Sequence, residues 1–273
     1  MNKITKVIGL ITILIVSTSL ISCQKKASDE GSKKVTKVVV ALSGSPKPYN
    51  YVNEKGELDG YEVAILKEID KRLPEIELDF QKTDFAGLFA GLDSNRYQVV
   101  SNNMTKKPER EEKYLFNDNY YVKNHTVIAV RETETKIKTI DDLQGKKVPG
   151  SSSGNATTLF LEKYNETHKA NPIKIIYTEA GYAPVLQDVQ NGRYDAYVVT
   201  ETYVDTAKKE LGLKLKTLPI KNEQEVQQSK GYFMFRKDQV ELKNKFDIVL
   251  TSLIKEGKLK ELSIKYFGKD YSR

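Results

Sequence analysis

A short polar segment followed by an arginine gives this chain side chains that could bind a carboxylate. The segment SNNMT, residues 101–105, follows a predicted strand, and Arg110 comes five residues after its threonine. A guanidinium binds a carboxylate through two parallel hydrogen bonds and stays charged at any working pH. Ligands of open α/β sheets bind at the carboxyl ends of the strands. The alternative for Arg110 is a surface ion pair with Glu109 or Glu111.

A second candidate anion site lies in the segment PGSSSGNAT, residues 149–157. It follows a predicted strand that starts at Lys146 and precedes a predicted helix. Backbone N–H groups at a helix N-terminus bind anions. The alternative is a plain flexible loop with a helix cap. If both candidates belong to one site, Arg110 and these amide donors would hold a carboxylate from two sides.

The usual sequence patterns of catalytic and metal sites are absent from the printed sequence. Its two histidines, His125 and His168, are far apart, and there is no HExxH motif, Cys/His cluster, P-loop or GxGxxG motif. The run SSSG at 151–154 is not a GxSxG elbow. We therefore expect a binding protein rather than an enzyme, with no cofactor and no metal.

The beginning of the chain has the features of a secretory signal. Lys3 and Lys6 precede an apolar run over residues 7–21, and LISC ends at the single cysteine, Cys23. The run is shorter than the roughly 20 residues of a spanning helix. LISC resembles the lipobox of bacterial lipoproteins, in which the cysteine is acylated. The alternative is an ordinary signal peptide with a chance cysteine.

We thus expect residues 1–22 to be removed and Cys23 to anchor the chain to a membrane surface. Residues 23–34 are polar and charged, as in a flexible tether. The formal net charge is +7, and the lysines are spread along the chain. We interpret this excess as a solvated surface, with nucleic-acid binding as a weak alternative because no basic stripe with interleaved aromatics occurs.

Strand and helix patterns alternate along the rest of the chain, which predicts an α/β fold. The predicted strands cover residues 37–42, 76–80, 97–101, 173–177 and 195–199, and a further strand starts at residues 146–148. The predicted helices cover residues 61–73, 85–92, 157–164, 184–190, 240–255 and 259–267.

One local pattern occurs twice. Leu88, Leu92 and the pair Arg96-Tyr97 precede an apolar strand, and Val185, Val189 and the pair Arg193-Tyr194 do so with identical spacing. In both places a helix is followed by a polar turn and an Arg-Tyr pair. The repetition suggests two lobes that are built alike.

Several long segments resemble the amino-acid-binding lipoproteins of ABC importers, which form family 3 of the extracellular solute-binding proteins. The resemblance covers residues 36–271 and is strongest to the cystine-binding branch. The segments that carry it are DFAGLFAGLDSNRYQVVSNNMTKKPEREEKYLFNDNYY (84–121), DDLQGKKV (141–148), NGRYDAYV (191–198), YFMFRKDQVELKNKF (232–246) and KLKELSIKYFGKD (258–270).

This resemblance implies a type II periplasmic-binding-protein-like fold. Each lobe would hold a mainly parallel sheet flanked by helices, and two hinge crossovers would join the lobes. Lobe 1 would comprise residues 35–124 plus 230–273, and lobe 2 residues 125–229. The lobes would close on one solute.

The resemblance also implies the roles of individual residues. The ligand-stacking aromatic falls on Phe85, and the carboxylate-binding arginine falls on Arg110. The donors of the two lobes fall on Asn102, Asn103, Thr105, Ser151, Ser153, Gly154 and Asn155. Two positions depart from the family pattern, because Ser43 and Thr200 stand where acids are usual. A buried ammonium without a counter-charge is costly. Either Glu201 or another acid replaces the missing one, or the amine binds neutral donors and water, or the solute lacks a standard α-amino group.

We therefore expect a lipid-anchored, extracellular, monomeric receptor that delivers a small amino acid, cystine by resemblance, to an ABC-transporter permease. One alternative is a sensor that reports the solute to a signalling receptor. Another is a secreted enzyme on the same fold, such as a dehydratase of a cyclic carboxylic acid. That enzyme would need Glu201 or Asp118 as its acid or base.

Overall fold

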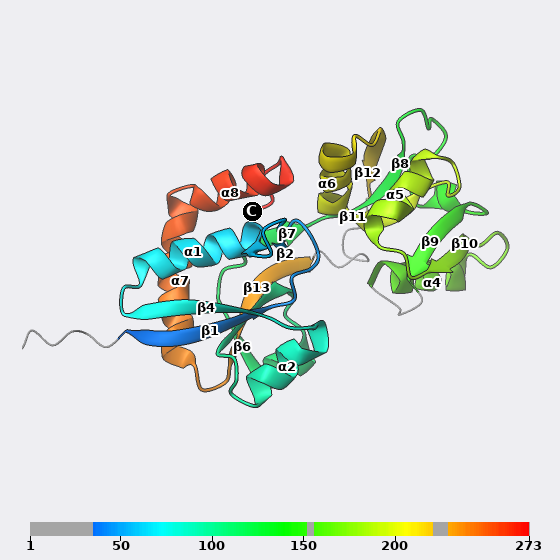
Figure 1. Cartoon of the computed structure of the whole chain (residues 1–273). Coiled ribbons are helices and arrows are strands. Elements are labelled where there is room, and N and C mark those ends of the chain that lie inside the picture. Colours follow the sequence, from blue (N-terminus) through cyan, green and yellow to red (C-terminus); the bar gives the residue numbers. More distant parts are fainter. Residues whose placement is uncertain (1–34, 152–155, 221–228, 273) are drawn as a thin grey trace, which may run out of the picture. The chain divides into compact units, whose positions relative to one another are not determined.

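The structure of the protein is a computed structural model that describes residues 35–151, 156–220 and 229–272. Cys23, Ser153, Gly154 and Asn155 lie outside the described residues. The described part is a two-lobed α/β structure of the type II periplasmic-binding-protein-like class, as the sequence predicted (Figure 1).

The first lobe is built on a mixed sheet in the order β4-β1-β5-β13-β6, with β7 also paired to β13. The strands are β1 (Thr36–Leu42), β4 (Ile76–Lys82), β5 (Val99–Met104), β6 (Tyr114–Phe116), β7 (Val122–Asn124) and β13 (Ser229–Arg236). β1 runs parallel to β4 and β5, whereas β13 runs antiparallel to β5, β6 and β7. The carboxyl ends of β1 and β5 therefore lie at the same edge.

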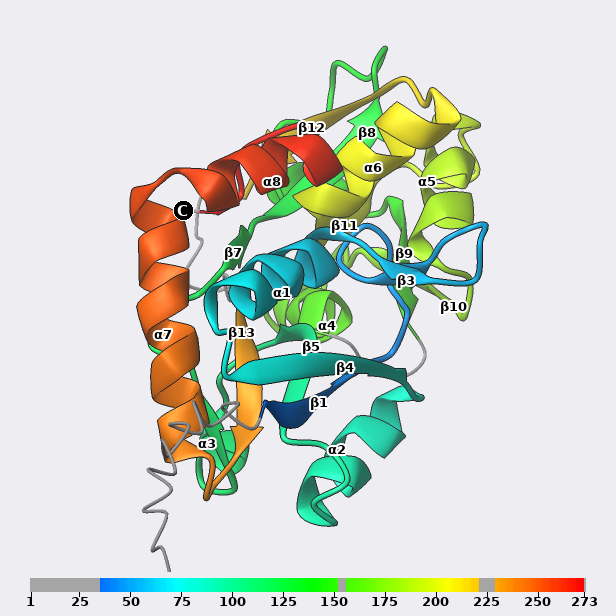
Figure 2. The ribbon, with the colours of Figure 1, turned by 60° about the vertical axis from the view of Figure 1, so that its left-hand side comes forward.

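Helices cover both faces of this sheet. The helices α1 (Tyr61–Arg72), α7 (Val240–Lys255) and α8 (Lys258–Phe267) share one apolar core, and α2 (Phe85–Asp93) packs into the other (Figures 1 and 2). Side chains of β1 alternate between the two cores, as a strand period of two requires. Val38 and Val40 belong to the first core, and Ala41 belongs to the second. The short strands β2 (Tyr51–Val52) and β3 (Leu58–Asp59) form a hairpin before α1.

The second lobe contains two smaller sheets. One is antiparallel in the order β11-β8-β12, and the other is the parallel pair β9-β10. The strands are β8 (Thr126–Arg131), β9 (Lys147–Ser151), β10 (Lys174–Thr178), β11 (Tyr197–Thr200) and β12 (Leu215–Pro219). The helices are α4 (Ala156–Thr167), α5 (Tyr182–Gln190), α6 (Glu201–Leu211) and the short 3₁₀ helix η1 (Asp141–Leu143). Their apolar side chains form two separate cores.

The repeated sequence pattern has the same backbone structure in both places. The N–H groups of Arg96 and Tyr97 both donate to the carbonyl of Gly91, at 2.8 and 3.1 Å. The N–H groups of Arg193 and Tyr194 both donate to the carbonyl of Asp188, at 2.9 and 3.4 Å. In each case a helix, α2 or α5, ends in this turn and a strand follows. The predicted local repeat is confirmed.

Every predicted strand differs from the observed one by at least one residue at one end or both. The strand predicted at 97–101 begins at Val99 and continues to Met104, and the strand predicted to start at Lys146 runs from Lys147 to Ser151. The partners of these extensions lie far away in sequence, since Met104 pairs with Tyr232 and Ser151 pairs with Thr178. The side chains of residues 102–104 are therefore held by a sheet rather than by a loop.

Candidate ligand-binding site

Arg110 lies in α3 (Pro108–Glu111), a single turn that begins shortly after β5 ends. The proline at its first position suits a helix start, because its missing N–H would have no intrahelical partner. Arg110 Nη1 donates to the carbonyl of Thr105 at 3.2 Å and lies 3.5 Å from its Oγ1. The sequence placed these two residues in one site, and the structure brings them into contact.

The guanidinium of Arg110 is partly buried, and none of the described carboxylates forms an ion pair with it. The alternative of an ion pair with Glu109 or Glu111 is thus not seen. Burial lowers the pKa of Arg110, while the charge of Glu109 acts in the opposite direction. The group stays cationic, because an arginine pKa lies far above neutrality. A partly desolvated cation of this kind favours an anionic partner.

Two phenylalanines of α2 lie next to this cation. The Arg110 guanidinium carbon is 5.4 Å from the centre of the Phe89 ring, and the Phe85 ring packs edge-on against Phe89 at 5.4 Å. Phe85 is 50% exposed, which is unusual for a phenylalanine and suits a ring that contacts a ligand. Phe89 was not predicted, although its position one helical turn after Phe85 was a signal for it.

The ends of β1 and β5 bring Ser43 and Asn102 together. Asn102 Oδ1 accepts hydrogen bonds from the Ser43 backbone N–H at 3.1 Å and from Ser43 Oγ at 2.6 Å. Asn103 adopts a left-handed backbone conformation with φ 49°, and its Oδ1 accepts from Asn124 Nδ2 at 3.1 Å. Asn102 is buried and Asn103 is partly exposed.

In the second lobe, Ser151 lies beside a cavity lined with tyrosines. The backbone N–H of Ser151 donates to Thr158 Oγ1 at 2.8 Å, which ties the end of β9 to the first turn of α4. A cavity of about 210 Å³ is lined by Ser151, Tyr182, Tyr197 and Tyr203 among others. Tyr182 and Tyr203 stack at 4.4 Å, and burial raises the pKa of both phenols. Sequence reasoning missed these tyrosines, because they come from three elements that meet only in the fold.

Ser43 and Thr200 occupy the two positions at which the resemblance leads us to expect an acid. Thr200 is the last residue of β11, and its side chain does not cap α6. The neighbouring Glu201 is held elsewhere, because its carboxylate pairs with Lys269 at 2.9 Å. Asp118 likewise pairs with Lys243 at 2.6 Å. Both candidate acids of the enzyme alternative therefore already have cationic partners.

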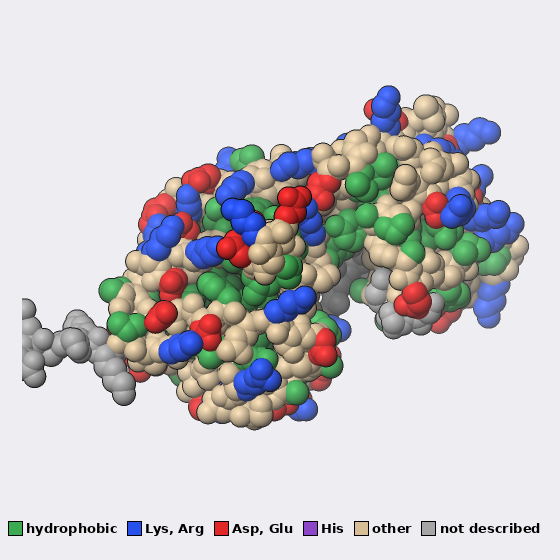
Figure 3. Space-filling view, viewed as in Figure 1, with side chains coloured by type: hydrophobic (Ala, Val, Ile, Leu, Met, Phe, Trp, Pro, Cys, Tyr) green, Lys and Arg blue, Asp and Glu red, His purple; other side chains and the backbone are tan. Residues whose placement is uncertain are grey.

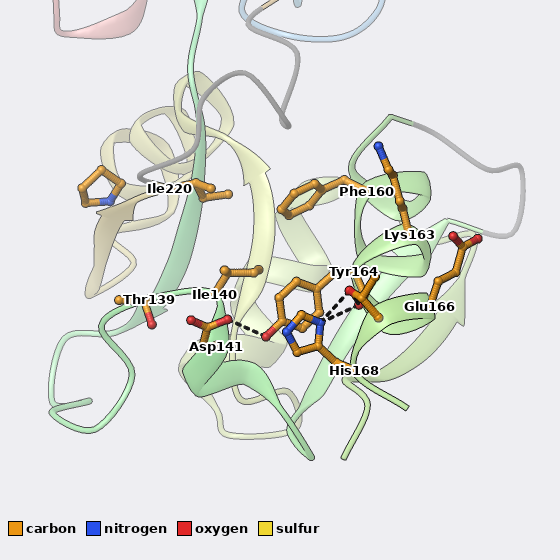
Figure 4. Close-up of a pocket in the computed structure, with 11 residues that line it drawn as sticks. Thr139, Ile140, Asp141, Phe160, Lys163, Tyr164, Glu166, His168 and Ile220 are labelled. Carbon is orange, nitrogen blue, oxygen red and sulfur yellow. Dashed lines mark hydrogen bonds between the residues drawn. The ribbon is translucent and has the colours of Figure 1, made fainter. Parts of the chain in front are cut away.

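A separate cavity lies at the opposite end of α4 (Figure 4). It encloses about 500 Å³, and its wall includes Asp141, Tyr164 and His168. The rings of Tyr164 and His168 are parallel and 3.9 Å apart. The Tyr164 hydroxyl donates to Asp141 at 2.6 Å, and His168 Nδ1 lies 2.8 Å from the Tyr164 carbonyl oxygen. Asp141, Tyr164 and His168 thus bind one another along this wall.

The surface charges agree with a solvated surface. Figure 3 shows lysine and arginine side chains interspersed with aspartate and glutamate side chains over the larger lobe.

Within the described residues, no group of three or more His, Cys, Asp and Glu side chains could hold a metal ion. No helix in that part of the chain is long and apolar enough to cross a membrane.

Comparison with known proteins gives a match that spans most of the chain. Residues 38–269 match the bacterial extracellular solute-binding proteins, family 3. The L-cystine-binding protein TcyK of Bacillus subtilis (strain 168) is 33% identical over 273 residues, which cover 100% of this chain and 99% of TcyK. The L-cystine-binding protein TcyJ of the same organism is 33% identical over 266 residues, covering 97% of this chain and 96% of TcyJ.

Solved structures give the same result. The probable amino-acid ABC transporter extracellular-binding protein ytmK of Bacillus subtilis superposes with a TM-score of 0.76 at 34% identity, over 86% of this chain and 99% of ytmK. A chain from a study of glutathione import via GshT and the cystine ABC importer TcyBC of Streptococcus mutans superposes with a TM-score of 0.73. It is 32% identical, over 88% of this chain and 98% of that chain.

Proposed function

The chain belongs to family 3 of the bacterial extracellular solute-binding proteins, and on that premise we propose that it binds a small amino acid for an ABC importer. The bound solute would lie between the lobes, with its carboxylate on Arg110. The closed, loaded protein would then dock on the permease.

The observation that carries this proposal is the state of Arg110. Its guanidinium is partly buried, has no carboxylate partner among the described residues and is oriented by Thr105. A fixed guanidinium of this kind can form two parallel hydrogen bonds to a carboxylate. Thr105 and Asn102 supply further polar groups at the same strand end.

Closure follows if each lobe holds part of the site. We assign residues 35–124 and 230–273 to lobe 1, and residues 125–229 to lobe 2. Lobe 1 would contribute Ser43, Phe85, Asn102, Asn103, Thr105 and Arg110. Lobe 2 would contribute Ser151, Thr200 and the segment 153–155. A ligand that contacts both lobes binds the closed form more tightly, so its binding shifts the population toward that form.

L-Cystine is the ligand that we propose, because two full-length relatives are named for binding it. Thr200 removes the acid expected beside the ligand ammonium, and Glu201 is already paired with Lys269. The tyrosine-lined cavity beside Ser151 could accept the ammonium through its hydroxyl groups and ring faces. Glutathione belongs in the same ligand panel, because one similar structure comes from a study of its import.

Calorimetry with L-cystine, L-cysteine, glutathione and the standard amino acids tests the proposal. We expect one tight ligand with an α-carboxylate, and Arg110→Ala should weaken its binding by about 2–5 kcal/mol, roughly 30- to 4,000-fold. Arg193→Ala is the matched control, because Arg193 is an exposed arginine paired with Asp188. Unchanged affinity in Arg110→Ala would refute the carboxylate clamp. Turnover of the bound compound would favour the enzyme alternative instead.

The lipid anchor is a separate proposal that rests on Cys23. We propose that Cys23 is acylated and tethers a monomer to the outer face of the cell membrane through residues 24–34. Labelling with radioactive palmitate should mark the wild-type protein in cells, while Cys23→Ala should lose the label. Retention of the label in Cys23→Ala would contradict this assignment.

Loss of solute uptake on deletion of the protein would separate transport from the sensor alternative.

A further inference from the structure

A buried carboxylate lies beneath the ends of β1 and β5, and neither the sequence patterns nor the comparisons assign it a role. Glu62, the second residue of α1, has no exposed surface. Its oxygens accept hydrogen bonds from Asn50 Nδ2 at 2.5 Å, from the Asn103 backbone N–H and from the Tyr121 hydroxyl. No described Lys, Arg or His forms an ion pair with it, and burial raises its pKa. A carboxylate in such a place is costly unless its oxygens are fully hydrogen-bonded.

The position of Glu62 is fixed by the segment that precedes α1. The backbone N–H of Tyr61 donates to the carbonyl of Pro48 at 3.0 Å, and that of Glu62 donates to the carbonyl of Tyr49 at 2.9 Å. The first turn of a helix has N–H groups without intrahelical partners, and here the chain next to Asn50 supplies their acceptors. These two hydrogen bonds fix the position of Glu62 relative to the segment that carries Asn50.

Asn50 connects this carboxylate to the turn that carries Ser43. Asn50 Oδ1 accepts from the backbone N–H groups of Gly44 at 2.8 Å and Ser45 at 3.2 Å. Asn50 Nδ2 donates to Glu62 and to Asn102 Oδ1, the latter at 3.2 Å. Since a backbone N–H can only donate, the two faces of the Asn50 amide cannot be exchanged.

The same reasoning fixes the orientation of Asn102. Its Oδ1 already accepts from the Ser43 backbone, from Ser43 Oγ and from Asn50. Its Nδ2 has no acceptor among the described residues. The chain of bonds therefore presents Asn102 as a hydrogen-bond donor at the end of β5.

We infer that Glu62 is a positioning residue, which acts through Asn50 to fix the donor and acceptor orientation of Ser43 and Asn102 in the ligand site. This inference rests on the proposed function, because it assumes that the ligand binds at these strand ends. If it is correct, the side-chain amide of Asn102 donates a hydrogen bond to an acceptor atom of the ligand.

An amide cannot replace this carboxylate. In Glu62→Gln, Oε1 could still accept from Asn103 and Tyr121, but the Nε2 group would then face the Asn50 Nδ2 donor. Rotating the glutamine amide would place Nε2 against the Asn103 N–H instead. One buried pair of donors is left facing each other in either case, and leaving a buried polar group unpaired is more costly than losing a net hydrogen bond.

The first experiment needs no ligand. Amide hydrogen exchange by NMR compares the wild type with Glu62→Gln, and Tyr121→Phe serves as the matched control that removes one donor and leaves Asn50 alone. We expect the amides of Gly44 and Ser45, which do not touch Glu62, to exchange at least about tenfold faster in Glu62→Gln and unchanged in Tyr121→Phe. Unchanged exchange at both amides in Glu62→Gln would overturn the inference.

The second experiment measures affinity for L-cystine by calorimetry. We expect Glu62→Gln to bind at least about tenfold more weakly than the wild type, and Tyr121→Phe to bind within about threefold. Asn50→Ala provides a second variant, which keeps the carboxylate and should weaken binding by a similar factor. If Asn50→Ala and Glu62→Gln both bind as the wild type does, the inference is wrong. If the wild type itself does not bind L-cystine, the proposed ligand is wrong, and the exchange experiment still decides the role of Glu62.

Discussion

The Arg110 guanidinium carbon lies 5.4 Å from the centre of the Phe89 ring, while Arg110 Nη1 donates to the carbonyl of Thr105. The ring and the carbonyl thus restrict the cation from two sides before any ligand is present. A side chain that is already ordered loses less conformational entropy on binding, which favours affinity. This contact makes Phe89 a testable part of the site, although it was not predicted from the sequence.

We predict that Phe89→Leu weakens ligand binding by about three- to tenfold. Leucine preserves the apolar packing of α2 but removes the ring face, and a partly exposed cation–π contact contributes about 0.5–1 kcal/mol or somewhat more. Calorimetry measures the affinity, and Tyr114→Phe is the control, because it keeps the second ring that packs against Phe89. Equal affinity in Phe89→Leu and the wild type would show that the ring does not order Arg110.

The exposed ring of Phe85 gives a different expectation. Phe85→Ala should weaken binding by about tenfold, because an aromatic ring that stacks on a ligand is lost. The unliganded protein should change in free energy of unfolding by no more than about 0.5 kcal/mol, since half of this side chain is exposed. Ile248→Ala is a suitable control, because Ile248 is 72% exposed on α7. A loss of stability without a loss of affinity would assign Phe85 to packing instead.

The sequence predicted the fold better than the boundaries of its strands. Apolar periodicity sufficed for α7, whose predicted and observed residues are both 240–255, because this helix packs through its own regular stripe. The extension of β5 to Met104 depends on Tyr232, more than one hundred residues away, and no local pattern reports such a partner. The helix α6 was not predicted, and neither were β6, β7, β8, β12 and β13.

In the candidate site, too, some residues could be predicted from the sequence and others could not. Arg110 and Thr105 were predicted together because they are five residues apart, and they are in contact. Glu62 was not predicted, since in the sequence it is one more acid near the start of a helix. Its burial and its three donors, from residues 50, 103 and 121, come from segments that meet only in the folded sheet.

A pH-dependent contribution to stability is expected from Arg72 and Glu256. Their side chains form two hydrogen bonds, of 2.7 and 2.6 Å, between the ends of α1 and α7. Hydrogen bonds from the Arg72 guanidinium and, to a lesser degree, from the Ser252 hydroxyl lower the pKa of Glu256 from 4.5 to about 2. A carboxyl group with a lowered pKa stabilises the folded state above its unfolded pKa, and that stability is lost as the pH falls through the folded pKa. The contribution should thus be complete above pH 4.5 and disappear between about pH 4.5 and 2.

Thermal unfolding of the wild type and Glu256→Gln from pH 2 to 7 tests this expectation. The difference in Tm should be constant above about pH 5 and should shrink toward zero near pH 2. High salt should reduce it, because both side chains are partly exposed to solvent. Glu241→Gln is the control, because Glu241 makes a single contact of 3.1 Å to Lys245 and is more exposed. A difference in Tm that does not vary with pH would contradict the role of the ion pair.

Substitution of Gly60 should destabilise the folded protein more than substitution of Gly56, which lies four residues earlier. Both have positive φ angles, 124° at Gly60 and 80° at Gly56, and such backbone conformations cost an L-residue about 1–3 kcal/mol. A Cβ atom at Gly60 would lie 2.4 Å from the carbonyl oxygen of Tyr49, whereas nothing lies within 4 Å of one at Gly56. Relief of that contact must move the backbone that accepts the N–H of Glu62. We therefore expect Gly60→Ala to lower the free energy of unfolding by about 3 kcal/mol or more, and Gly56→Ala by about 1–2 kcal/mol. Urea denaturation measures both values, and equal losses in the two variants would show that the segment before α1 adapts to the added methyl group.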